Sequence, residues 1–172
     1  ISVNGVCQTV TKFDENSFTV FAVEETLNKT TLKKLKINDI VNLETSLTLN
    51  KKIGGHLVYG HVDTVGKIIN INKSPNEILL TVEFDREFNK YVIHVGSIAI
   101  DGVSLTIAKL SDNSITVAII PHTWINTIFK TKIVGDLVNL EFDFIGKYVE
   151  KQLSQTSQKS NVTIDWLREY GF

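Results

Sequence analysis

Most of this chain repeats itself after 97 residues. Val3–Glu44 aligns with Ile100–Glu141 without a gap, and 16 of the 42 paired positions are identical. A repeat of this length is too long for a solenoid and is typical of a duplicated domain. We therefore expect two similar folded units with similar pockets, and we look for the chemistry where the two copies differ.

The second copy has a leading segment without a counterpart in the first. Residues 57–97, which number 41, precede the second copy, whereas the first begins at the start of the chain. We expect that about 41 residues before Ile1 would complete the first unit. The predicted organisation is a first barrel domain in 1–46, a second in 47–145, and a helical tail in 146–172 that could mediate oligomerisation.

Composition excludes several classes of partner. The 172 residues are 42% hydrophobic with a net charge of −1, and the lysines and arginines are spread along the chain. This even spread of charge differs from the basic patch of a nucleic-acid-binding protein. The chain contains no run of 18 apolar residues, so no membrane span is expected. No signal-peptide pattern is present, and the single cysteine, Cys7, cannot form an internal disulfide. These features predict a cytoplasmic protein without nucleic-acid or membrane partners.

The periodicity is mostly that of short strands separated by turns. The sequence predicts strands at Val6–Lys12, Ser17–Val23, Ile40–Leu43, Leu57–Ile71, Ile78–Phe84, Val103–Leu110, Ile115–Ile120 and Leu137–Leu140. Helical turns are expected at Glu24–Leu32 and Pro121–Phe129, a helix at Lys147–Leu153, and a last helix, Ile164–Tyr170, capped by Thr163. Many short strands predict an all-β fold of small closed barrels followed by a C-terminal helix.

A few residues could carry chemistry, and each has a structural alternative. Cys7 is paired with Ser104 in the repeat and could be a reactive thiol or a small buried hydrophobe. Ser104 and Thr106 alternate on one strand, so both point into a pocket or both lie on a polar face. His61 could move protons near neutral pH or be a structural histidine. His56 and His61 are too weak a pattern for a metal site, and no metal is expected.

Four stretches together resemble the riboflavin synthase family of lumazine-binding proteins: VNGVCQTVT, GGHLVYGHVDTVG, KYVIHVGSIAIDGVSLTI and IPHT. The resemblance covers essentially residues 1–150. It implies two homologous six-stranded Greek-key barrels in tandem with a C-terminal helix, and a homotrimer with each active site between barrels of neighbouring subunits. It also implies transfer of a four-carbon unit between two molecules of 6,7-dimethyl-8-ribityllumazine, giving riboflavin and 5-amino-6-ribitylamino-pyrimidinedione, with no cofactor.

Site residues follow from the resemblance, position by position. Catalytic roles are implied for His61 as acid or base, for Cys7 in polarisation or transient addition, and for Ser104 and Asp143. Substrate-binding positions are implied at Cys7, Gln8, Thr9, Val23, Glu25, Thr26, Gly60, His61, Val62, Val95, Ser104, Leu105, Thr106, Ile120, Pro121, His122 and Thr123. Val23 and Ile120 would supply apolar walls for the rings, and the paired threonines at the helical turns would bind polar groups of the ligand.

One departure keeps a second hypothesis open. Family members commonly carry a basic residue in a Tyr-x-x-x-Lys-Gly pattern, where this chain has Val95 before Gly96. The absence of this basic residue favours a non-catalytic lumazine- or flavin-binding protein of the same fold. The presence of Cys7, His61, Ser104 and Thr106 favours the enzyme. A flavin reductase is disfavoured because no nucleotide-binding glycine-rich domain is present.

Overall fold

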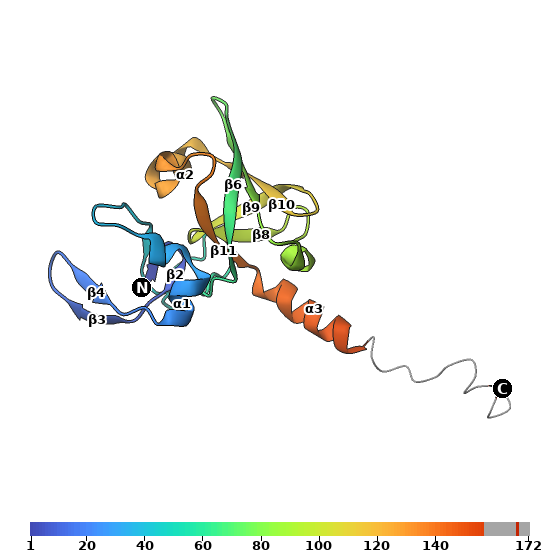
Figure 1. Cartoon of the computed structure of the whole chain (residues 1–172), viewed down its shortest axis with the longest axis horizontal. Coiled ribbons are helices and arrows are strands. Elements are labelled where there is room, and N and C mark those ends of the chain that lie inside the picture. Colours follow the sequence, from blue (N-terminus) through green and yellow to red (C-terminus); the bar gives the residue numbers. More distant parts are fainter. Residues whose placement is uncertain (157–167, 169–172) are drawn as a thin grey trace.

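The computed structural model describes residues 1–156 and Arg168. The predicted helix Ile164–Tyr170 and its cap Thr163 lie outside the described residues, apart from Arg168 itself. The helix predicted at Lys147–Leu153 is confirmed as part of α3 (Phe144–Thr156), which extends away from the rest of the molecule (Figure 1). None of the helices in the described part of the chain has both the length and the apolar character needed to cross a membrane.

Six antiparallel strands close into a barrel in the second half of the chain (Figure 1). The strand order around the barrel is β10-β7-β6-β11-β8-β9. The strands are β6 (Thr64–Lys73), β7 (Ile78–Glu83), β8 (Ser97–Ile100), β9 (Val103–Leu110), β10 (Ser114–Ile119) and β11 (Leu137–Phe142). The strands predicted at Ile78–Phe84, Val103–Leu110, Ile115–Ile120 and Leu137–Leu140 are confirmed.

Alternation along the strands fills the barrel. On β10 the side chains of Ile115, Val117 and Ile119 are buried, and the residues between them point outward. On β7 every second residue, Ile78, Leu80 and Val82, is buried in the same way. Successive side chains of a strand point to opposite faces, so this alternation fixes which face of each strand forms the core.

The first half of the chain forms two smaller sheets beside the barrel. The strands β1 (Ser2–Val3), β2 (Val6–Cys7) and β5 (Leu43–Glu44) pair in the order β2-β1-β5, and β3 (Val10–Phe13) pairs with β4 (Phe18–Val20). The described residues of this half therefore form no second closed barrel. The predicted strands Val6–Lys12 and Ile40–Leu43 are in part wrong, because the first is interrupted at Gln8–Thr9 and the second begins at Leu43.

The helical turns of the two halves correspond closely. Helix α1 (Glu24–Lys29) is followed by the 3₁₀ helix η1 (Thr31–Lys34), and α2 (Pro121–Asn126) is followed by η3 (Ile128–Thr131). Each pair differs by 97 residues at both ends. Both predicted helical segments are thus confirmed, and each is an α-turn joined to a 3₁₀-turn.

The strand predicted at Leu57–Ile71 begins only at Thr64. The backbone N–H groups of Tyr59 and Gly60 donate to the Glu141 carboxylate, so neither is available to a strand ladder. Gly60 has a φ of +77°, which also breaks the extended conformation. Residues 57–63 are therefore an irregular segment held by a side chain of β11.

Two tight hairpin turns meet where the halves join. Asn4–Gly5 and Asp101–Gly102 each connect neighbouring strands through two residues with positive φ, the backbone that a two-residue hairpin favours. A Cβ atom on Gly5 would lie 2.5 Å from the Gly102 backbone nitrogen. The two backbones therefore approach so closely that neither glycine position can carry a side chain.

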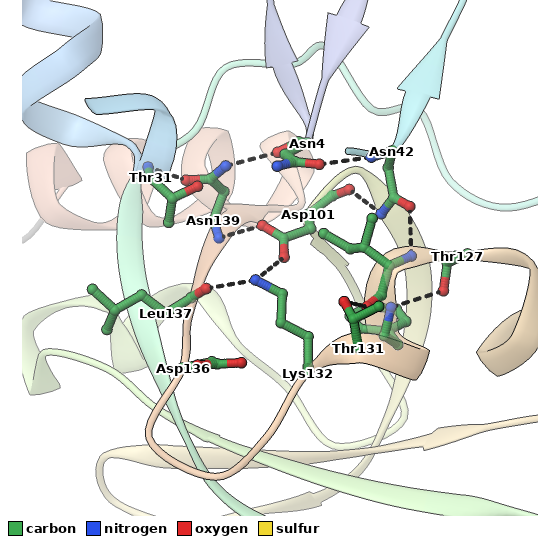
Figure 2. Close-up of polar contacts among 12 residues, drawn as sticks. Asn4, Thr31, Asn42, Asp101, Thr127, Thr131, Lys132, Asp136, Leu137 and Asn139 are labelled. Carbon is green, nitrogen blue, oxygen red and sulfur yellow. Dashed lines mark hydrogen bonds and ion pairs between the residues drawn. The ribbon is translucent and has the colours of Figure 1, made fainter. Parts of the chain in front are cut away.

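A reciprocal exchange of hydrogen bonds surrounds this contact (Figure 2). The Asn42 side chain donates to the Asp101 carbonyl (2.9 Å), and the Asn139 side chain donates to the Asn4 carbonyl (2.8 Å). The same two side chains accept from the backbone N–H groups of η3 and η1, at Ile128 (2.9 Å) and Thr31 (2.7 Å) respectively. Asn42 of the first half thus hydrogen bonds with backbone groups of the second half, and Asn139 of the second half does the same for the first. These bonds hold the two halves in a defined relative orientation.

The start of α3 is anchored to the barrel. Lys147 donates to both carboxylate oxygens of Asp63, at 2.7 and 2.5 Å, and Asp63 also accepts from the Phe142 backbone N–H. The Phe144 ring packs edge-on against Tyr59 with centroids 5.1 Å apart. The beginning of α3 is therefore coupled to the irregular segment that carries Gly60 and His61. A 3₁₀ helix, η2 (Arg86–Tyr91), also lies against it.

Candidate functional site

A cavity of about 700 Å³ lies between the two halves. It is lined by β1 and β2 of the first half, by residues of the connecting segment 44–60, and by Gly102 and Ser104 of the second. Three of the predicted site residues, Cys7, Gly60 and Ser104, line this one cavity. The structure thus brings the paired positions of the repeat, Cys7 and Ser104, to a shared space.

Cys7 is presented at the end of β2 with an exposed, free thiol. Its backbone N–H donates to the Gly60 carbonyl at 2.8 Å, and a Cβ atom on Gly60 would lie 2.8 Å from Cys7 Cβ. Only a glycine allows this approach. Because the thiol is exposed, the alternative of a small buried hydrophobe does not describe Cys7.

Glu141 positions the segment that contacts Cys7. Its carboxylate is 5% exposed and accepts from the backbone N–H groups of Tyr59 at 2.7 Å and of Gly60 at 2.8 Å. His61 follows directly, and its exposed ring stacks on Tyr59 with centroids 5.9 Å apart. One buried carboxylate therefore sets the course of the chain through both Gly60 and His61, although His61 does not line the cavity.

Ser104 is held by His56. The Ser104 Oγ atom accepts the His56 backbone N–H at 3.3 Å and lies 2.8 Å from the imidazole Nδ1. Burial lowers the pKa of His56 below its ordinary value, and the carboxylates of Asp143 and Glu141 act in the opposite direction. The imidazole is therefore neutral at neutral pH and is linked directly to a hydroxyl that faces the cavity.

The alternation predicted on β9 is confirmed. Ser104 and Thr106 lie on one face of the strand, whereas Leu105, 8% exposed, belongs to the core on the other. The Leu105 side chain therefore points away from the face where Ser104 and Thr106 lie. Val95 is exposed and donates its backbone N–H to the carbonyl of Ile107, next to Thr106. Its φ of +62° is unusual for a β-branched residue.

The other predicted binding residues do not line the 700 Å³ cavity. At the start of α1, Val23 and Glu25 are exposed and Glu25 pairs with Lys29 at 2.6 Å. The Thr26 and Thr123 carbonyls accept the hydroxyls of Thr30 and Thr127. The corresponding start of α2 exposes Ile120, Pro121 and His122 and leaves Thr123 half-buried.

The remaining predicted positions surround the cavity or lie beyond it. Gln8 is buried, and its side chain donates to the Cys7 carbonyl at 2.8 Å. Thr9 is exposed and Val62 is half-buried. Asp143 accepts the Ile145 N–H at 3.0 Å at the start of α3 and lies near enough to influence His56 electrostatically.

Sequence reasoning missed His56 and Glu141. The sequence offers His56 only as part of a weak metal pattern, and the one signal of its role is the glycine directly before it, Gly55, which allows a close backbone approach. Glu141 is identical to Glu44 in the repeat, but Glu44 is exposed, so the repeat alone does not reveal the buried role of Glu141. Among residues 1–156 and Arg168, no group of three or more His, Cys, Asp or Glu side chains is placed to hold a metal.

The site can bind and polarise a small polar molecule. A thiol and a hydroxyl line one cavity, a neutral imidazole is bonded to the hydroxyl, and a second imidazole lies one residue beyond Gly60. Such groups can donate hydrogen bonds, move a proton or add to an electrophilic carbon.

Comparison with known proteins identifies the family. The model of the lumazine binding domain matches residues 1–46 and 59–143. A riboflavin synthase from Bacillus amyloliquefaciens is 47% identical, with all of this chain and 81% of that protein covered. The chain belongs to the riboflavin synthase family. A riboflavin synthase from Schizosaccharomyces pombe is 44% identical over 88% of this chain and 73% of its own length.

Solved structures agree with the family assignment at the level of the fold. LumP in complex with riboflavin superposes with a TM-score of 0.75 and 25% identity, covering 83% of this chain and 77% of that one. LumP in complex with 6,7-dimethyl-8-(1'-D-ribityl) lumazine gives a TM-score of 0.73 at the same identity, covering 83% and 76%. The two LumP structures thus share this arrangement of strands with the described part of the chain.

Proposed function

We propose that this protein is a riboflavin synthase, a transferase that converts two molecules of 6,7-dimethyl-8-ribityllumazine into riboflavin and 5-amino-6-ribitylamino-pyrimidinedione. The observation that carries the proposal is the 47% identity to a riboflavin synthase across the whole chain. The reaction moves a four-carbon unit from one lumazine to the other. It requires two stacked heterocycles, a proton acceptor for a ring methyl group and a group able to add to or polarise a ring.

We assign the chemistry to Cys7, His61, Ser104 and Asp143. The exposed thiol of Cys7 and the hydroxyl of Ser104 support this, because both line one cavity and both can contact a ring held there. His61 is exposed beside Tyr59, so its imidazole is accessible for proton transfer. Val23, Ile120 and the other exposed residues at the starts of α1 and α2, together with the half-buried Thr26, would contact the rings or the ribityl chains.

We further propose that the two halves derive from one six-stranded Greek-key barrel, of which the described residues of the first half form only part, with domains at 1–46 and 47–145 and a tail at 146–172. The 97-residue spacing of α1 from α2 and the reciprocal bonds of Asn42 and Asn139 support this.

We propose a cytoplasmic homotrimer. Exposed apolar side chains along α3, at Ile145, Tyr148, Val149 and Leu153, support association through that helix. The lone free Cys7 suits a reducing compartment.

A second candidate is a protein that binds lumazine or riboflavin without converting them. It is favoured by Val95, which stands where the family commonly has a basic residue, and by the structural likeness to LumP complexes. Mixing the protein with 6,7-dimethyl-8-ribityllumazine alone and following riboflavin absorbance separates the two. Riboflavin appearing without any additive supports the enzyme, and bound but unconverted lumazine refutes it.

A further inference from the structure

The connecting segment packs against Ser104 more closely than its role as a linker requires. A Cβ atom on Gly55 would lie 2.4 Å from Ser104 Oγ, whereas one on Gly54 would meet no atom within 4 Å. The close approach at Gly55 brings both the backbone N–H and the ring Nδ1 of His56 to the same Oγ atom. His56 therefore contacts Ser104 twice, on the side of the hydroxyl that faces the connecting segment.

The tautomer of His56 follows from its second nitrogen. His56 Nε2 is buried, and no residue in the described part of the chain hydrogen bonds with it. If the proton were on Nε2, a buried N–H donor would be left without a partner. If the proton is on Nδ1, it donates to Ser104 Oγ and leaves only a lone pair unsatisfied. Buried N–H groups without partners are the rarer and costlier case, which favours the Nδ1–H form.

We propose that His56 is a positioning residue that makes the Ser104 hydroxyl a hydrogen-bond donor toward the cavity. The backbone N–H and the Nδ1–H of His56 occupy both lone pairs of Oγ, so the hydroxyl hydrogen is left for a ligand. The group recognised would be an acceptor, such as a ring carbonyl, a ring nitrogen or a ribityl oxygen. This inference rests on the proposed function, because it takes the ligand of the cavity to be a ribityllumazine.

Asparagine and aspartate have nearly the same shape, but only asparagine can donate a hydrogen bond. Placing each of them at position 56 therefore tests whether the side chain there must be a donor. In His56→Asn an amide N–H can still donate to Ser104 Oγ, so binding of 6,7-dimethyl-8-ribityllumazine should stay within about threefold of the unchanged protein. In His56→Asp the new group only accepts, so it draws the Ser104 hydroxyl away from the ligand. Loss of that one hydrogen bond should weaken the lumazine Kd by about tenfold, measured by the ligand's fluorescence.

The Ser104→Ala background shows whether the effect passes through Ser104. There, the Asn and Asp variants should bind the lumazine equally. The proposal is overturned if the two variants bind equally with Ser104 present. It is also overturned if their difference persists with Ser104→Ala, because the carboxylate would then act on the ligand directly. Gly55→Ala should weaken binding as His56→Asp does, and Gly54→Ala is its matched control.

A ligand-free measurement keeps this inference distinct from the proposed function. Nitrogen NMR of the unchanged protein reports which imidazole nitrogen of His56 carries the hydrogen. We expect Nδ1–H, and a hydrogen on Nε2 alone overturns the inference even if the lumazine binds. If the unchanged protein fails to bind the lumazine while His56 carries Nδ1–H, the proposed function fails and the hydrogen-bond arrangement stands.

Discussion

A buried carboxyl at the junction of the halves makes a strong prediction about stability. Asp101 is fully buried, its Oδ1 accepts the Asn139 backbone N–H at 2.8 Å, and its Oδ2 lies 3.4 Å from Lys132 Nζ (Figure 2). Burial raises the pKa of Asp101 from 3.8 to about 6, although Lys132 and the Asn139 N–H favour the charged form. The charge is therefore less favourable in the folded protein than in the unfolded chain.

The sign and size of the effect follow from this shift. Because the folded pKa of Asp101 is raised, its contribution to stability is complete below a pH of about 4 and is lost as the pH rises through about 6. Each unit of pKa corresponds to about 1.4 kcal/mol. The ionised Asp101 therefore lowers the free energy of unfolding at neutral pH by about 3 kcal/mol relative to a neutral group.

The first half of the chain supplies the replacement. Asn4 takes the position of Asp101, and its Oδ1 accepts the Asn42 N–H at 2.7 Å, while Leu35 takes the position of Lys132. Transferring this neutral pair as Asp101→Asn with Lys132→Leu keeps the hydrogen bond from the Asn139 N–H and removes both charges, but the Leu137 carbonyl loses the bond that Lys132 donates at 2.9 Å. Allowing about 1 kcal/mol for that lost bond, we expect the free energy of unfolding at neutral pH, measured in urea, to rise by about 2 kcal/mol. The contribution of this site to the loss of stability between acidic and neutral pH should disappear.

The single substitution Lys132→Leu is the control. It leaves the buried carboxylate without its cation and should lower the free energy of unfolding at neutral pH by about 3 kcal/mol. The reasoning is refuted if the double variant is less stable than the unchanged protein at neutral pH. It is also refuted if the double variant loses stability between acidic and neutral pH as steeply as the unchanged protein.

Two further predictions concern side chains that satisfy backbone groups across the molecule. Asn139→Ala leaves the buried Thr31 N–H and Asn4 carbonyl unpaired. It should therefore lower the free energy of unfolding by about 2–5 kcal/mol in urea. The equivalent Asn42→Ala should lower the free energy of unfolding by less than Asn139→Ala does, because Asn42 is half-buried and water can replace its side chain. A loss equal to or larger than that of Asn139→Ala would contradict this. Glu141→Gln keeps one of two acceptor oxygens and should accelerate hydrogen exchange at Tyr59 or Gly60; unchanged exchange at both would show that the carboxylate does not hold this segment.

Local patterns allowed much of the fold to be predicted. The alternation of Ser104, Leu105 and Thr106 placed β9, and the repeat placed both helical turns, because strand and helix periods are properties of neighbouring residues. The residues after Leu57 misled the prediction. Their apolar character is typical of a strand, but the backbone N–H groups of Tyr59 and Gly60 are taken by Glu141, more than 80 residues further along the chain.

The sequence by itself determined that the chain is doubled, that its second half consists of short alternating strands, and that Cys7 and Ser104 are equivalent positions. Tertiary structure alone decided that both of these side chains line one cavity and that His56 holds Ser104 across 48 residues. It also decided that Asn42 and Asn139 each hydrogen bond with backbone groups of the opposite half. The reason is physical: periodicity records which face of a segment is apolar, whereas a buried polar group is satisfied by whatever partner the closed barrel brings within hydrogen-bonding distance.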